Sequence, residues 1–295
     1  MEKQILTIAD LKEAGSNKLP RVSREYYNQG AMDMITLQEN ESAFDSFKIR
    51  PRILTNVSNV DTSTTLFGKK VSLPLGFAPA AMHGLAHADG ERATSRAAID
   101  LGIPMGLSTY ATTTLEEVIQ QPGSDKIPYG FQLSILQNRE TSLQWIKRAE
   151  ASGYKALFIT VDAPVLGHRL NEKRNKLELP DSLCLPNLKG EEYVDSAGVK
   201  YTKPVRTFYN PGRDPSNTWE SVIPWVRSHT KLDIWLKGIY TPEDVLLAIK
   251  YKVDGIIISN HGGRQLDGVP ATVYALAECA PVAKGRIKIA IDGVL

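Results

Sequence analysis

The sequence predicts an α/β protein built as a (β/α)8 TIM barrel that follows a helical N-terminal extension. From Ser72 onward, seven short apolar runs alternate with amphipathic helical patterns, as in a parallel sheet with crossover helices. The length of 295 residues fits one barrel of ~250 residues with a short extension. We therefore expect a single domain over residues 1–295, with the barrel in residues 74–295.

Each apolar run is nearly continuous, which is typical of a parallel strand buried on both faces. The runs occupy residues 75–80, 103–108, 128–133, 156–162, 232–237, 254–259 and 287–292. Between them, residues 139–152 place Leu143, Ile146 and Ala149 on one helical face, and residues 242–251 begin a helix with proline. Seven repeats indicate an eight-stranded barrel that is incomplete in this chain. An open doubly wound sheet is the competing architecture, but APAAMHG stands where its GxGxxG is expected.

Three segments fall outside this repeat. Residues 1–60 are predicted to be helical, with helices over 21–30 and 36–47. Residues 64–73 carry Gly-Lys at a turn and are predicted to form a small hairpin at the bottom of the barrel. Residues 170–217 are rich in charge, proline and glycine and are far longer than an ordinary loop, so we expect a mobile lid over the barrel mouth.

Composition narrows the class of partner. The chain has 35 Lys and Arg against 33 Asp and Glu, which gives no electrostatic footprint for nucleic acid or an anionic membrane. Its two cysteines, Cys184 and Cys279, form no CxxC, so neither a disulfide framework nor a metal site is expected. The start MEKQILTIADLKEAG lacks the apolar core of a signal peptide. We expect an intracellular protein that acts on a small molecule.

The predicted strands end on polar residues, where the active sites of such barrels lie. These residues are Ser108, Gln132, Thr160, Asp162, Lys237, Ser259 and Asp292. Lys237 and Gln132 end apolar runs, so their polar groups would face the barrel mouth and need partners there. The alternative is that these residues are chance polar caps.

The densest polar cluster is SNHGGRQLD at positions 259–267, which places the base His261 beside the anion-binding Arg264. Ser259 with His261 could belong to a hydrolase triad, but no GxSxG accompanies them. Lys237 could also be the Schiff-base lysine of an aldolase, which would leave the arginines without a role.

Several motifs together resemble one family. SNHGGRQLD, TVDAPVLGHR, YYNQGAMDMITLQEN with FKIRPRIL, and FAPAAMHGLAHADGE are similar to those of the FMN-dependent 2-hydroxy-acid oxidases and dehydrogenases, such as glycolate and lactate oxidases. The resemblance spans nearly the whole chain. It implies FMN as the cofactor, oxidation of an (S)-2-hydroxy acid, and transfer of its electrons to the flavin and then to oxygen.

By this resemblance, His261 is the base that takes a proton from the substrate while two electrons pass to the flavin, and Asp162 orients the imidazole. A carboxylate in that position is expected to raise the histidine pKa and to stabilise the imidazolium. Arg169 and Arg264 resemble the clamp for the substrate carboxylate, to which Tyr26 adds a hydroxyl.

The resemblance also assigns the flavin and substrate contacts. Lys237 is expected beside the pyrimidine edge of the flavin, where its charge stabilises the reduced ring. Further flavin contacts are expected from Pro79, Ala80, Ala81, Ser108, Gln132, Thr160, Ser259, Asp292 and Gly293. Tyr110 and Ser134 are expected to shape the substrate pocket.

The sequence departs from the family pattern in two places. Ser134 stands where the family usually has a tyrosine whose hydroxyl contacts the substrate. After Asp292 and Gly293 the family continues into a phosphate-binding loop and an eighth strand, whereas this chain ends at Leu295. The alternative function is therefore a flavin-free pseudoenzyme or interaction fragment. The family further implies a homotetramer in the cytoplasm or the peroxisome.

Overall fold

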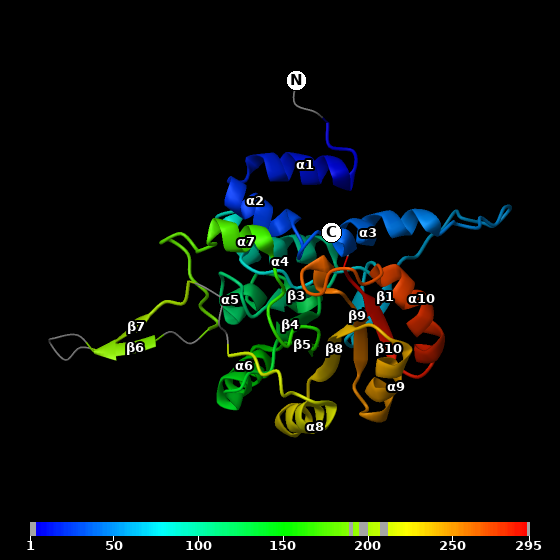
Figure 1. Ribbon diagram of the computed structural model, residues 1–295. Coiled ribbons are helices and arrows are strands. Elements are labelled where there is room, and N and C mark those ends of the chain that lie inside the picture. The colour runs from blue at the N-terminus through cyan, green and yellow to red at the C-terminus, as the bar shows by residue number, and fades with distance from the viewer. Residues whose placement is uncertain (1–3, 189–190, 195–199, 207–211, 294–295) are drawn as a thin grey trace.

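The computed structural model describes residues 4–188, 191–194, 200–206 and 212–293. Its centre is one curled sheet of six parallel strands in the order β10-β9-β8-β5-β4-β3 (Figure 1). The strands are β3 (Met105–Ser108), β4 (Tyr129–Leu133), β5 (Ala156–Thr160), β8 (Asp233–Ile239), β9 (Gly255–Ile258) and β10 (Lys288–Ile291). In the described ranges, β3 and β10 are not paired with each other, so the sheet is an open part of the predicted barrel.

The first predicted strand is not a strand. Residues 75–80 contribute only an isolated parallel bridge, between Phe77 and Met105. Pro79 has no N–H for a ladder, and Gly76 lies so close to Pro104 that an added Cβ would stand 2.7 Å from its carbonyl oxygen. The segment therefore runs beside β3 at the correct place in the barrel without forming regular pairing.

Helices cover the outer face of the sheet, as Figure 1 shows for α6, α8, α9 and α10. They are α4 (Gly90–Leu101), α5 (Leu115–Ile119), α6 (Arg139–Ser152), α8 (Trp219–His229), α9 (Pro242–Lys250) and α10 (Thr272–Ala283). The predicted helix over 139–152 is confirmed residue for residue, because Asn138 caps its start and Gly153 adopts φ +94° after its end. Between helices and sheet lies the main core, which includes Leu157, Ile159 and Leu236.

The inner face of the sheet changes from apolar to polar side chains along the strands β5, β8 and β9. Toward the bottom, Phe158, Trp235 and Ile257 form a small apolar cluster. The hairpin of β1 (Thr64–Leu66) and β2 (Lys69–Val71) adds Phe67, whose ring centroid lies 5.8 Å from that of Phe158 and 5.2 Å from that of Trp235. Two residues further along the same strands the side chains point to the same face, so Thr160, Lys237 and Ser259 lie above this cluster. The alternation places polar groups at the carboxyl ends.

The remaining elements lie outside this sheet and its outer helices. They are α1 (Ile8–Lys18), α2 (Arg21–Asn28), α3 (Ile35–Ser42), α7 (Leu170–Asn175), the hairpin β6 (Glu191–Val194) and β7 (Lys200–Lys203), and the 3-10 turns η1 (Ala43–Ser46), η2 (His83–Leu85), η3 (Ser124–Lys126) and η4 (His261–Gly263). In the long segment 170–217, Leu177, Leu179 and Leu185 are buried against Tyr26 of α2. The expected lid is thus partly docked, and some of it lies outside the described residues. Across the described ranges, no helix combines the length and the apolar character that a bilayer span requires.

Candidate functional site

The carboxyl ends of the strands surround a cavity of about 410 Å³. This volume lies in the range of small-molecule pockets, roughly 300–1,000 Å³. The predicted site residues that line it are Tyr26, Pro79, Ala80, Ala81, Ser108, Tyr110, Gln132, Ser134, Thr160, Arg169, Lys237, His261, Arg264, Asp292 and Gly293. Asp162 and Ser259 contact lining residues from behind. The structure therefore brings all the predicted residues together.

His261 and Asp162 form a pair at this cavity, with 3.0 Å between Nδ1 and Oδ1. His261 has φ +60°, a left-handed conformation, and its backbone N–H donates to the Ser259 hydroxyl. Asp162 needs a glycine opposite it, since a Cβ on Gly238 would stand 2.6 Å from its Cβ. Gly238 was not predicted from the sequence, although its place directly after Lys237 was a signal for close approach.

Burial decides the protonation state of this pair. It lowers the pKa of His261 below 6.5, and the nearby Asp162 carboxylate does not fully offset it. Asp162 raises the histidine pKa as expected, but the effect of burial is larger and the net pKa is lowered. Burial acts to raise the pKa of Asp162, but His261 and Lys237 together outweigh it, and the net pKa is lowered. The resting pair is thus a neutral imidazole that donates to a carboxylate.

The two predicted clamp arginines meet at a carboxylate that was not predicted. Arg264 donates through Nη2 to Glu172 at 2.7 Å, and Arg169 Nη1 lies 3.5 Å from the same carboxylate oxygen. Glu172 is in the first turn of α7, three residues after Arg169, a spacing that places both on one helical face. Burial lowers the pKa of Arg169 to about 10, so it stays charged at neutral pH.

Tyr26 lines the cavity together with the arginines and packs against Arg264. The Arg264 guanidinium stands 4.7 Å from the centre of its ring, and Arg264 Nη1 donates to the carbonyls of Tyr26 and Gln29. Burial raises the Tyr26 pKa, so the hydroxyl keeps its proton and can act as a donor. These contacts leave Arg264 with little freedom to change its direction.

Lys237 is held among anionic and hydroxyl groups. Its Nζ lies 2.8 Å from Asp292 and donates to Ser259 at 2.9 Å. Burial acts to lower the Lys237 pKa, but Asp292 and Asp162 more than compensate, and the net pKa is raised. The amine is therefore a fixed cation, which does not suit the Schiff-base alternative because that chemistry needs a neutral amine.

The polar wall of the cavity fits a flavin ring. Gln132 donates to Thr160 at 2.9 Å, which fixes both side chains, and Asp292 Oδ1 is buried without a partner among the described residues. Lys237 supplies a cation on the same wall, and Ala80 with its neighbours forms a backbone wall opposite. Ser108 accepts from the Tyr110 N–H, so at least part of its role is to shape the turn.

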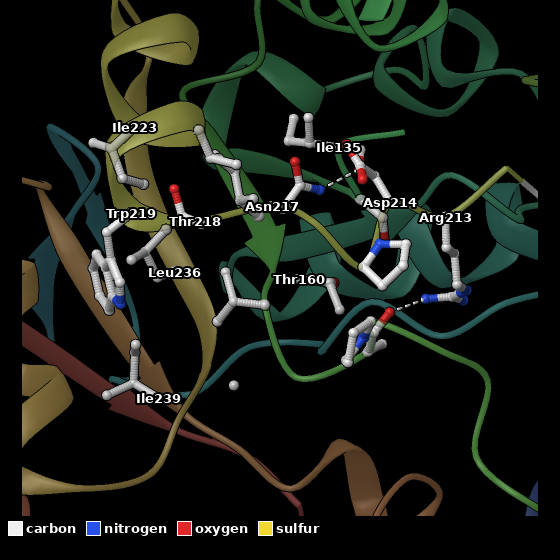
Figure 2. A pocket seen from close by; sticks show the side chains of 18 of the residues that line it. Ile135, Thr160, Arg213, Asp214, Asn217, Thr218, Trp219, Ile223, Leu236 and Ile239 are labelled. Atoms are coloured by element: carbon white, nitrogen blue, oxygen red, sulfur yellow. Dashed lines mark hydrogen bonds between the residues drawn. The ribbon is translucent and has the colours of Figure 1, made fainter. Parts of the chain in front are cut away.

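A second cavity of about 230 Å³ adjoins the first, and Figure 2 shows it from close by. Ser134, Thr160 and Arg213 line both cavities. Arg213 was not predicted as a site residue because it belongs to the long segment after β5 and no motif marks it.

Comparison with known proteins gives a consistent result. The model of a family described as FMN-dependent dehydrogenase matches residues 15–295. The chain is 50% identical to oxidase FUB9 of Fusarium oxysporum f. sp. lycopersici, covering 98% of this chain and 74% of that protein. It is 41% identical to glycolate oxidase of Spinacia oleracea, covering 98% and 77%, and 38% identical to 2-hydroxyacid oxidase 1 of Homo sapiens, covering 99% and 79%. Among solved structures, mandelate oxidase with benzoyl-formic acid superposes with a TM-score of 0.86 at 32% identity, covering 99% and 79%.

Proposed function

The chain belongs to the FMN-dependent dehydrogenase family, and we propose that it oxidises an (S)-2-hydroxy acid to the 2-oxo acid and passes the electrons to oxygen. The observation that carries this function is the position of the His261–Asp162 pair and the Arg169–Arg264 pair on one cavity. A base and a carboxylate clamp on one cavity are what proton removal from a 2-hydroxy acid requires. The names of the relatives, glycolate oxidase and 2-hydroxyacid oxidase, support the same reaction.

Binding of the substrate begins at the arginines. Arg169 and Arg264 carry two positive charges and share one carboxylate, Glu172, so the cluster has a net charge of +1. A substrate carboxylate neutralises this charge, and the Tyr26 hydroxyl adds a donor. Because Arg264 is fixed by two backbone carbonyls, binding also aligns the substrate.

Proton transfer is the task of His261. The Nδ1–H donates to Asp162, which leaves Nε2 as the acceptor for the proton of the substrate hydroxyl. Burial keeps the ring neutral before reaction, and Asp162 stabilises the imidazolium afterwards. FMN, when bound, supplies the acceptor for the hydride that leaves the α-carbon. Lys237 lines the cavity as a fixed cation and would stabilise negative charge on a flavin bound there.

The residues that would hold the flavin are those of the polar and backbone walls. They are Pro79, Ala80, Ala81, Ser108, Gln132, Thr160, Lys237, Ser259, Asp292 and Gly293. A homotetramer and a cytoplasmic or peroxisomal location are further parts of the proposal. The location is supported by a relative named peroxisomal (S)-2-hydroxyacid oxidase GLO4 of Arabidopsis thaliana.

The test is anaerobic mixing of the purified yellow protein with a panel of (S)- and (R)-2-hydroxy acids while flavin absorbance is followed. We expect bleaching by at least one (S)-acid and not by its (R)-enantiomer, followed by return of the colour and formation of one hydrogen peroxide per product when oxygen enters. A colourless protein, or a yellow one that no 2-hydroxy acid bleaches, would support the flavin-free alternative instead.

A further inference from the structure

Arg213 is a third guanidinium at the substrate cavity, beyond the two that bind the substrate carboxylate in the proposed function. It lines the substrate cavity and the second cavity beside Ser134 and Thr160. In Figure 2 it lies at one end of the second cavity, with Trp219 and Ile239 at the other. The two cavities therefore meet at a wall that Arg213 helps to form.

The backbone of Arg213 is fixed to the segment that carries Ser134. Arg213 and Leu136 form an antiparallel bridge, and the Gln137 N–H donates to the Gly212 carbonyl at 2.9 Å. A few residues on, the Asn217 side chain donates to the Ile135 carbonyl at 2.8 Å, as Figure 2 shows. Arg213 is thus anchored by tertiary contacts, and its place at the cavity is part of the fold.

No carboxylate neutralises Arg213 within the described ranges. Its Nη1 donates to the Ala163 carbonyl at 2.9 Å, and its side chain also hydrogen-bonds to Tyr110. Its Nε is shielded from solvent and has no partner among the described residues. The adjacent Asp214 instead lies 3.6 Å from Arg139 and accepts from the Ser216 hydroxyl. Among the described residues, Arg213 is thus a partly buried cation with no carboxylate partner and an unpaired Nε, and such a guanidinium favours the binding of an anion.

The charge of the neighbouring groups defines what that anion is. The Arg169–Arg264–Glu172 cluster has a net charge of +1, which one carboxylate satisfies. Arg213 adds a second positive charge, close enough to Arg169 to lower its pKa. A single planar guanidinium matches a carboxylate through two parallel hydrogen bonds, whereas a phosphate would carry more charge than one arginine neutralises.

We propose that Arg213 binds a second carboxylate, at the far end of the substrate side chain, so that the preferred substrates are (S)-2-hydroxy dicarboxylates. This proposal rests on the proposed function, because it assumes that the first carboxylate binds to Arg169 and Arg264. Ser134 contributes by leaving space between the reacting carbon and Arg213 where a larger side chain would stand.

The test compares (S)-2-hydroxyglutarate with its 5-amide, a neutral substrate of the same shape, on the flavin-loaded protein. We expect kcat/KM for the dicarboxylate to exceed that for the amide by roughly 10- to 100-fold, the effect of a hydrogen bond between charged groups. In Arg213→Gln this ratio should fall to about 1 while kcat/KM for the amide is retained. Arg213→Lys, which keeps the charge and loses the fork, should give an intermediate ratio.

Arg206→Gln is the matched control. Arg206 belongs to the same long segment and pairs with Asp181 at 2.5 Å, but it lines neither cavity. The substitution Arg206→Gln removes the same charge as Arg213→Gln, and it should leave the ratio of kcat/KM for the dicarboxylate to that for the amide unchanged. A wild-type protein that oxidises the amide as well as the dicarboxylate would overturn the role of Arg213 without any variant, and so would an unchanged ratio in Arg213→Gln. Failure to oxidise any 2-hydroxy acid would instead overturn the proposed function.

Discussion

Replacement of Asp162 by asparagine tests the catalytic pair because it should change two measurable quantities. The rate of flavin reduction should fall, and the acid limb of the pH profile should move to lower pH. Asparagine has the same shape, so it fits beside Gly238 and its oxygen can still accept from His261 Nδ1. Only the negative charge is removed. The imidazolium that forms during reaction then loses its counter-ion, while the neutral imidazole of the resting protein loses little.

The magnitude follows from the separation of the two groups. The contact atoms are 3.0 Å apart, and charge centres at about 4 Å with an effective dielectric constant of about 20 attract by ~4 kcal/mol. About half of this develops at the transition state if the proton is half transferred. The loss of ~2 kcal/mol corresponds to a rate of flavin reduction lower by roughly 30-fold, and the full ~4 kcal/mol to roughly 1,000-fold.

Asp162→Asn should also change the pH dependence of kcat/KM, in a direction set by the effect of Asp162 on the His261 pKa. Asp162 raises the His261 pKa against the larger effect of burial, so Asp162→Asn should lower that pKa further. The acid limb of kcat/KM should therefore move to lower pH while the plateau falls. Stopped-flow flavin reduction from pH 5 to 8 measures both, with Asp254→Asn as a control, since Asp254 pairs with Arg227 away from the cavity. A plateau within a factor of three of wild type, or an acid limb that moves to higher pH, would refute the assigned roles.

Four further outcomes are expected. Because burial holds the His261 pKa below 6.5, the midpoint of the acid limb of wild-type kcat/KM should lie below pH 6.5; a midpoint above 6.5 would contradict this. Arg264→Lys should raise KM and lower kcat together, since one ammonium cannot replace a fork that donates to Tyr26, Gln29 and Glu172. Substrates whose 1-carboxylate is replaced by an amide should be less affected by the substitution, and an equal loss would place the clamp elsewhere. Ser134→Tyr should improve turnover of glycolate or lactate relative to bulkier 2-hydroxy acids, and unchanged ratios would mean that the position does not face the substrate. Lys237→Met should slow flavin reduction by ~10²- to 10³-fold, and a rate within tenfold of wild type would exclude its electrostatic role.

Local chemistry made much of the architecture predictable. The helix at Arg139–Ser152 was predicted with the correct bounds because the residues that cap it, Asn138 and Gly153, directly precede and follow it in the sequence. Polar residues at strand ends, such as Lys237 and Gln132, could be placed in the site because parallel strands end at one edge of the sheet. By contrast, the run at 75–80 looked like a strand from its apolar residues, whereas it pairs with β3 only at the bridge between Phe77 and Met105.

The parts of the site that escaped prediction depend on contacts distant in sequence. Arg213 is placed at the cavity by a bridge to Leu136, which lies 77 residues earlier in the sequence, and no sequence motif encodes that contact. The net lowering of the His261 pKa likewise depends on how much protein surrounds the ring, whereas the sequence indicated only the raising effect of Asp162. Glu172 is the exception, because it lies only three residues after Arg169 in the sequence.

The measurement that tests the central claim most directly is the anaerobic rate of flavin reduction by an (S)-2-hydroxy acid in the wild-type protein and in His261→Ala, with flavin content measured in both. His261 lines the cavity, and among the described residues its side chain hydrogen-bonds only to Asp162. We predict that the variant keeps its flavin and is reduced more slowly by over ~10⁴-fold, beyond the ordinary loss of a general base. A yellow variant that retains a tenth of the wild-type reduction rate would contradict the assignment of His261 as the base.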